Sequence, residues 1–249
     1  MTWPNSGCSM VLNGAVQDRI HIRRFLDKYR LTLRVKVKVV DNASRKSIED
    51  HNRKAVDSCP PLLIAYFQGH GLPHSDNVKF ITSDEREDGT LEGLTAEELV
   101  EMSSKLTTQT KSVVITDFCF SGNVYRLKFY LQVEQDGSGS WHLTEGWSEE
   151  ITSPMGRNRS TKPPGWGAML PKWSLADLKT ALITLPQILL HLRRRVDYHL
   201  GAAKVHPKGR VTFKDAKQVP QIYSNYMWPL DDLRILLKFG LEETIPISD

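Results

Sequence analysis

The chain has 249 residues, of which 40% are hydrophobic and 25% charged, a balance typical of a soluble globular protein with one large domain or two small ones. A formal net charge of +4 is too small to indicate a nucleic-acid-binding protein. The sequence contains no long uncharged apolar run and no signal-type N-terminus, which argues against membrane insertion and secretion. Three scattered cysteines are typical of a reducing compartment, so we expect a cytoplasmic protein. From the charge and the hydropathy we expect neither membrane nor nucleic-acid partners.

Residues 10–125 alternate between helical and strand-like patterns. Apolar residues at helical spacing predict a helix over 16–30, a polar one over 44–59, and a third that opens at the capping box Thr95–Glu98. Short apolar or alternating runs predict strands at 33–40, 62–67, 78–82 and 112–116. Such βα units predict an α/β fold, a three-layer sandwich whose mostly parallel central sheet carries helices on both faces.

The pattern changes after residue 125. Strands at 127–134 and 141–143 form a predicted hairpin, and 145–172 is predicted to be a long irregular loop. An apolar stripe predicts a helix over 184–200, and 220–224 is expected to be a late strand or an extended segment. We therefore expect a single domain, 1–249, with a first half at 10–125, an irregular loop region at 126–183 and a second half at 184–249.

Two chemically suggestive motifs follow buried strands of the first half. Tyr66–Gly71 places His70 just beyond one strand, and Asp117–Gly122 places Cys119 just beyond another. In parallel sheets, chemistry gathers at the carboxyl ends of the strands. A cysteine and a histidine brought together there form a minimal nucleophilic site, in which the imidazole activates the thiol and later protonates a leaving amine.

Five segments together resemble the caspase/metacaspase superfamily, most closely the caspase-domain proteins common in fungi. The match is carried by Leu12–Asp18, Gly69–Gly71, Lys79–Asp84, Asp117–Gly122 and Val219–Ser224, and the interval of about fifty residues between histidine and cysteine is typical of caspases. The resemblance implies a caspase-like cysteine endopeptidase that acts on protein or peptide substrates. Residues 10–125 would correspond to the large catalytic subunit and 184–249 to the small one.

The resemblance also implies roles for particular residues. Cys119 would be the nucleophile, His70 the general base, and the N–H groups of Gly71 and Cys119 the oxyanion hole. Asp18 and Asp117 would line an acidic pocket, which implies cleavage after Arg or Lys. Each residue also has a purely structural alternative. Cys119 would then be a buried structural cysteine, His70 a loop histidine held by its glycines, Asp18 a solvated helix charge and Asp117 a strand-end cap.

Two departures keep other classes of function open. The family's cysteine motif usually carries a second histidine where this chain has Phe120, and only ten residues, MTWPNSGCSM, precede the segment before which the family places a buried strand. These departures support an alternative, a catalytically weak or inactive caspase-fold module that acts in regulation or assembly. A different cysteine hydrolase on a similar sheet is a third class.

The sequence also contains a candidate calcium site and candidate sites of self-processing. Hard carboxylate oxygens bind Ca²⁺, so the acidic cluster Asp84, Glu85, Glu87 and Asp88 is a candidate calcium site, although a solvated acidic loop is the interpretation we favour. No other cofactor and no oligomeric state are predicted. Arg157 and Arg159, in the basic, proline-rich loop between the two halves, are candidate self-processing sites.

Overall fold

The central sheet joins segments from both halves of the chain. The computed structural model describes residues 2–3, 8–9, 16, 18–20, 22–23, 36–74, 77–145, 165–168, 184–205 and 219–232. In these residues six strands pair in the order β3 (Leu62–Gln68), β7 (Lys111–Asp117), β10 (Gly165–Ala168), β11 (Ile222–Ser224), β8 (Phe129–Val133) and β9 (Gly139–Leu143). Strands β3, β7 and β10 are parallel, and the remaining described pairings are antiparallel. The α/β fold is therefore confirmed, with the parallel part of the described sheet at β3, β7 and β10.

Smaller strands and three helices complete the described structure. A three-stranded antiparallel sheet contains β4 (Gly71–His74), β5 (Asn77–Glu85) and β6 (Leu91–Thr95), and β1 (Thr2–Trp3) pairs with β2 (Cys8–Ser9). The helices are α2 (Arg45–Ser58), α3 (Ala96–Ser104) and α4 (Leu185–Val205). The described residues between 16 and 23 are helical, as expected. None of the described helices is long and apolar enough to cross a membrane.

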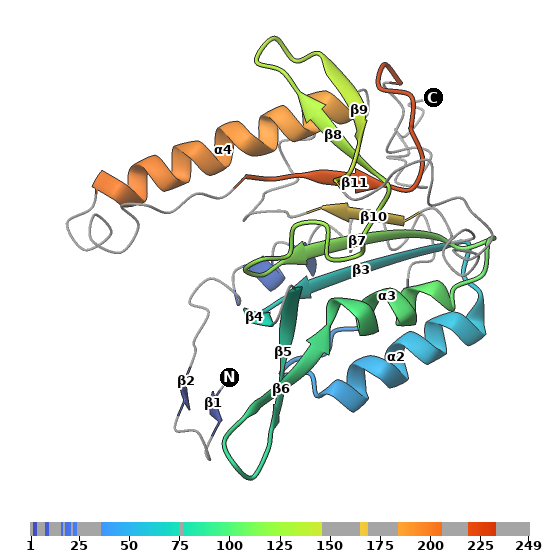
Figure 1. The fold of residues 1–249 in the computed structure, drawn as a ribbon, viewed down its shortest axis with the longest axis vertical. Helices are drawn as coiled ribbons and strands as arrows, with labels where there is room; N and C mark the ends of the chain where they lie inside the picture. Colours follow the sequence, from blue (N-terminus) through green and yellow to red (C-terminus); the bar gives the residue numbers. More distant parts are fainter. Residues whose placement is uncertain are drawn as a thin grey trace, which may run out of the picture.

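Both faces of the central sheet are covered, as the three-layer prediction required. Successive side chains of a strand point to opposite faces. On β7, Val114 packs with Leu99 of α3 in one apolar cluster, whereas Val113 packs with Leu189 of α4 in another. We call these clusters the α3 core and the α4 core. Figure 1 shows α2 and α3 together on one side of β3 and β7, with α4 on the opposite side, next to β8.

The start of α3 shows how local sequence sets an element boundary. The Thr95 hydroxyl accepts a hydrogen bond from the Glu98 N–H at 3.3 Å, and Glu98 Oε2 accepts one from the Thr95 N–H at 2.8 Å. This capping box satisfies two donors that the first turn leaves open. Arg45, the first residue of α2, also donates to Glu98, so the same carboxylate ties the two helices together.

Two sequence predictions are wrong for the residues described. Residues 36–40 form no strand, although 33–40 alternates; Val39 and Val40 are exposed, so the alternation here has no sheet face to bury. Residues 165–168, expected within an irregular loop, form β10, which pairs with β7 on one side and β11 on the other. Two glycines and a nearby pair of prolines concealed this strand, whose hydrogen bonds come from neighbours far away in the sequence.

Candidate active site

The register of two parallel strands brings the ends of the two motifs to one edge of the sheet. From Leu62↔Lys111 to Gln68↔Asp117, each residue of β3 pairs with the residue of β7 that lies 49 positions later. His70 and Cys119 both lie two residues beyond the last of these pairs. The structure therefore places the predicted base and nucleophile at the same level, just past the carboxyl ends of adjacent strands.

Gly71 lies directly against the backbone of Cys119. A Cβ atom added to Gly71 would be 2.0 Å from the Cys119 carbonyl oxygen, so only glycine fits there without a backbone shift. The Ile81 N–H donates to the His70 carbonyl at 2.9 Å and holds the histidine turn onto β5. The Cys119 side chain is exposed and His70 is half-buried, so a substrate can reach the thiol.

The two predicted pocket aspartates lie together, joined by a side-chain amide. Gln68 Nε2 donates to Asp18 Oδ2 at 2.8 Å and lies 3.5 Å from Asp117 Oδ2. The Tyr66 hydroxyl donates to the same Asp117 oxygen at 2.9 Å. Tyr66, Gln68 and Asp117 alternate in phase with Leu62 and Val113, so this acidic pair lies on the α4 side of the sheet.

Asp18 is the more deeply buried acid of the pair. Its residue is only 7% exposed, and its Oδ1 atom has no hydrogen-bond partner among the described residues. A buried carboxylate oxygen without a donor is costly, and a cation supplied from outside would remove that cost. The arrangement suits a ligand that brings positively charged N–H groups.

Tyr66 is a neutral hydrogen-bond donor to this acidic pair. Burial raises the pKa of the Tyr66 phenol well above its usual range, and the negative charges of Asp117 and Asp18 raise it further. Tyr66 therefore keeps its proton and remains a hydrogen-bond donor to Asp117 throughout the physiological pH range. It orients one oxygen of Asp117 without neutralising the charge.

The loop that follows Cys119 has an unusual backbone. Phe120, Asn123 and Arg126 have φ values of 62°, 44° and 51°, in the left-handed region that non-glycine residues rarely occupy. Asn123 stabilises the loop, because its side chain accepts from the Leu127 N–H at 2.7 Å and donates to the Leu127 carbonyl at 3.1 Å. Backbone strain of this kind is commonly concentrated at functional sites.

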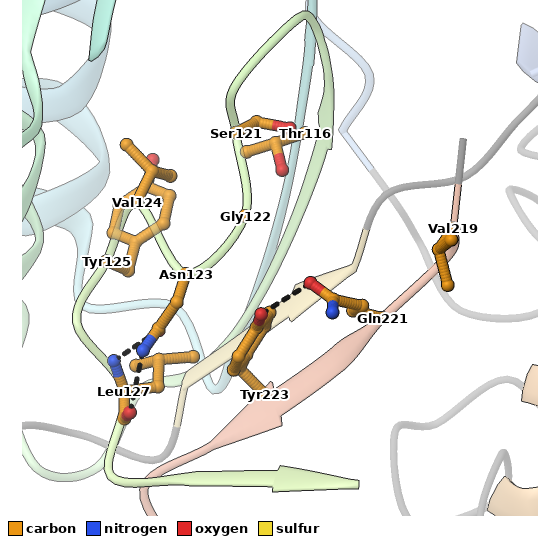
Figure 2. Close-up of a pocket in the computed structure, with 10 residues that line it drawn as sticks. All are labelled: Thr116, Ser121, Gly122, Asn123, Val124, Tyr125, Leu127, Val219, Gln221 and Tyr223. Atoms are coloured by element: carbon orange, nitrogen blue, oxygen red, sulfur yellow. Dashed lines mark hydrogen bonds between the residues drawn. The ribbon is translucent and has the colours of Figure 1, made fainter. Parts of the chain in front are cut away.

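A cavity lies beside this loop, on the other face of the β7 end (Figure 2). Its lining includes Thr116, Ser121, Gln221 and Tyr223, and the Tyr223 hydroxyl donates to Gln221. Thr116 is in phase with Val114 and so faces the α3 side, whereas Asp117 faces the α4 side. The cavity lining contains none of the five predicted site residues, and it is separate from the acidic pair.

The candidate calcium cluster does not form a metal site in the described residues. Asp84 Oδ2 accepts hydrogen bonds from the Arg45 N–H and, at 2.9 Å, from the Thr82 hydroxyl, and Asp88 Oδ1 accepts from the Thr90 N–H at 2.8 Å. Across the described parts of the chain, no three His, Cys, Asp or Glu side chains come together as metal ligands. These carboxylates order the surrounding turns, and dependence on Ca²⁺ stays a prediction.

Sequence reasoning missed the contribution of Tyr66 and Gln68. The one signal for them was alternation: both residues share a strand face, and the polar Gln68 ends an otherwise apolar run. Their partners could not be identified from the pattern, because Asp18 is 50 residues away from Gln68 and Asp117 is 51 away from Tyr66.

Comparison with known proteins agrees with the geometry. The family model of the caspase domain, peptidase family C14, matches residues 5–164, which is more than half of the chain. The matched region includes the histidine turn, the cysteine motif and both aspartates. A search of curated proteins found no match to this chain.

Proposed function

The chain belongs to the caspase-domain family of cysteine peptidases, and we propose that it is an active endopeptidase that cleaves after Arg or Lys. Its nucleophile is Cys119 and its general base is His70. The observation that carries the proposal is the β3–β7 register, which gives both residues the same position beyond adjacent strand ends. The close approach of Gly71 to the Cys119 backbone supports the same pairing.

The proposed reaction has two stages. The Cys119 thiol gives its proton to the His70 imidazole, and its sulfur attacks the carbonyl carbon of the scissile peptide bond. The C–N bond then breaks, the imidazolium gives its proton to the leaving amine, and a thioester remains on Cys119. Water, deprotonated by His70, hydrolyses the thioester, releases the acid product and restores the thiol. The N–H groups of Gly71 and Cys119 stabilise the oxyanion of each tetrahedral intermediate.

The acidic pair gives this reaction its specificity. A guanidinium has five N–H donors in a planar fork, and carboxylates are the acceptors that it matches best. Asp18 Oδ1 is buried without a described partner, and Asp117 is held by Tyr66 and Gln68. A basic side chain before the cut supplies the missing charge and donors, whereas an acidic one would be repelled.

The proposal is tested with internally quenched peptides that carry a single Arg, Lys, Asp or Leu before the cleavage position. We expect cleavage after Arg and Lys, and a loss of at least about a thousandfold in kcat/KM for Cys119→Ala and for His70→Ala, with unchanged circular dichroism. Cys59→Ala is the matched control, since Cys59 is also an exposed free thiol. Preferred cleavage after Asp, or near-normal turnover by either variant, would refute the proposal. A folded wild-type protein without any turnover would favour the inactive caspase-fold module.

A further inference from the structure

The position at which a cation would touch both acids of the pocket is occupied by a neutral nitrogen. Gln68 Nε2 lies 2.8 Å from Asp18 Oδ2 and 3.5 Å from Asp117 Oδ2. The attraction of a cation to two carboxylates is strongest where it lies close to both of them. An uncharged amide therefore fills the most favourable place for a compact positive charge.

The register of the two strands positions this amide. Gln68 is the last residue of β3 and pairs directly with Asp117 of β7, so the two side chains leave the same face of the sheet. The Gly69 N–H donates to the Asp117 carbonyl at 3.4 Å, which extends the contact between the two chains beyond the strand end. Gln68 is half-buried, so a ligand can still reach its amide.

The hydrogen bonds around the amide leave one acceptor of Asp18 for a substrate. Asp117 Oδ2 accepts from the Tyr66 hydroxyl at 2.9 Å and from Gln68, and Asp18 Oδ2 accepts from Gln68. Asp18 Oδ1 has no hydrogen-bond partner among the described residues. The donors of the protein thus converge on the two Oδ2 atoms. A substrate cation has to approach Asp18 Oδ1 beside the amide, because the place between the acids is filled.

Lysine and arginine differ in how well they suit such a pocket. A lysine ammonium is a compact, strongly hydrated point charge, whose three donors share one nitrogen. With Gln68 in place, that nitrogen cannot take the position between the acids. An arginine guanidinium is more weakly hydrated and has five N–H donors spread over a planar fork. It can donate to Asp18 from one nitrogen and to a second acceptor, such as the Gln68 amide oxygen, from another.

We propose that Gln68 is a specificity-determining residue, which makes the acidic pocket select arginine over lysine before the cut. This inference rests on the proposed function, because it takes the acidic pair as the binding site of that residue. One further hydrogen bond to a charged group corresponds to a discrimination of at least about tenfold. If Gln68 only separated two like charges, its loss would instead weaken the binding of Arg and Lys alike.

The test compares internally quenched peptides that differ only in Arg or Lys before the cut. For wild type we expect kcat/KM to be at least about tenfold higher with Arg. Gln68→Ala and Gln68→Ser should each lower this Arg-to-Lys ratio to about two or less, because an ammonium can then enter between the acids. Gln132→Ala is the matched control, since Gln132 is an exposed glutamine that donates to Glu134 at 2.7 Å. It should leave the ratio unchanged.

The two substrates should respond to the Gln68 variants in opposite directions. Turnover of the Arg peptide should fall, because the amide oxygen is lost, whereas turnover of the Lys peptide should rise. A purely structural role would lower both by the same factor, which would contradict the inference. An Arg-to-Lys ratio near one in wild type, or a ratio that survives both variants, would also overturn it.

A binding measurement keeps this inference separate from the proposed hydrolysis. In the Cys119→Ala background, the dissociation constant of the uncut Arg peptide should be at least about tenfold lower than that of the Lys peptide, and addition of Gln68→Ala should remove the difference. If the wild type hydrolyses nothing but this Gln68-dependent preference is present, the hydrolysis proposal fails and the role of Gln68 stands. If the wild type cleaves both peptides equally well, the hydrolysis proposal stands and the role of Gln68 is refuted. Equal binding of the two peptides would refute it whatever the activity.

Discussion

Gln68 donates a hydrogen bond from its side-chain amide to the carboxylate of Asp18 at 2.8 Å, and the same nitrogen lies 3.5 Å from Asp117. One neutral amide therefore stands between two acids whose sequence positions differ by 99. It offers two N–H donors, whereas two carboxylates offer about eight acceptor positions. The remaining acceptors are what a basic side chain would use, and this relationship is the physical basis of the proposed specificity.

The first prediction concerns this acidic pair. Asp117→Asn and Asp18→Asn should each lower kcat/KM for Arg and Lys peptides by about 100-fold or more, because removal of one member of a buried charge pair is expensive. Labelling by a small thiol reagent without a basic group should proceed at the wild-type rate.

Asp41→Asn is the matched control, since Asp41 is an exposed acid that pairs with Arg19 at 2.6 Å. If the variants lose as much reactivity toward the small thiol reagent as toward Arg and Lys peptides, the aspartates support the fold or the nucleophile and not the specificity.

The second prediction uses the contact between Gly71 and Cys119. Gly71→Ala should reduce kcat/KM by about 100-fold, because a new Cβ 2.0 Å from the Cys119 carbonyl oxygen forces the two motifs apart. Gly201→Ala is the control: among the described residues nothing lies within 4 Å of the position that a Cβ on Gly201 would take, and alanine favours the helix. Steady-state kinetics of Gly71→Ala at the wild-type level would mean that the observed proximity has no bearing on the reaction.

The third prediction concerns stability and pH. Burial opposes the ionisation of Glu98, but the hydrogen bond and charge of Arg45, together with the Thr95 N–H, overcome it and lower the pKa of Glu98 below its ordinary 4.5. A carboxyl group whose pKa is lower in the folded protein stabilises the fold at pH values above its ordinary pKa. This stabilisation is lost as the pH falls through the folded-state pKa. Glu98→Gln should therefore cost about 1 kcal/mol of unfolding free energy at pH 7 and progressively less below pH 4.5.

Denaturant unfolding of both proteins at pH 7 and at roughly pH 3 measures this difference. Glu101→Gln is the control, since Glu101 forms an exposed ion pair with Lys105. A cost for Glu98→Gln that is the same at both pH values would contradict the assignment.

Local patterns predicted the elements that their own residues determine. The capping box placed the start of α3 correctly, and the apolar runs placed β3 and β7 within a residue. Strand β10 was missed because its hydrogen bonds come from β7 and β11, 50 or more residues away. The sequence also placed His70 and Cys119 just beyond the ends of two strands, and those strands are adjacent. It gave no sign of the contact between Gln68 and Asp18, because no local pattern identifies a partner 50 residues away.

The fourth prediction concerns self-processing. Arg157 and Arg159 lie outside the described residues, in the segment between the caspase-like first half and α4, and both would suit the acidic pocket. Purified wild type should convert to two fragments cut after one of these arginines, and Cys119→Ala should remain whole. Intact-mass spectrometry after prolonged incubation, with and without Ca²⁺, follows the reaction. An uncut wild-type chain under both conditions would exclude self-processing there.

The most direct test of the central claim is to ask which cysteine reacts with an irreversible, arginine-containing peptide probe. Cys59 and Cys119 are both exposed free thiols, so exposure alone predicts similar labelling of the two. The Cys119–His70 assignment predicts that peptide mapping by mass spectrometry finds the adduct on Cys119 and that His70→Ala slows its formation by at least about 100-fold. Comparable labelling of Cys59, or a labelling rate at Cys119 that does not depend on His70, would contradict it.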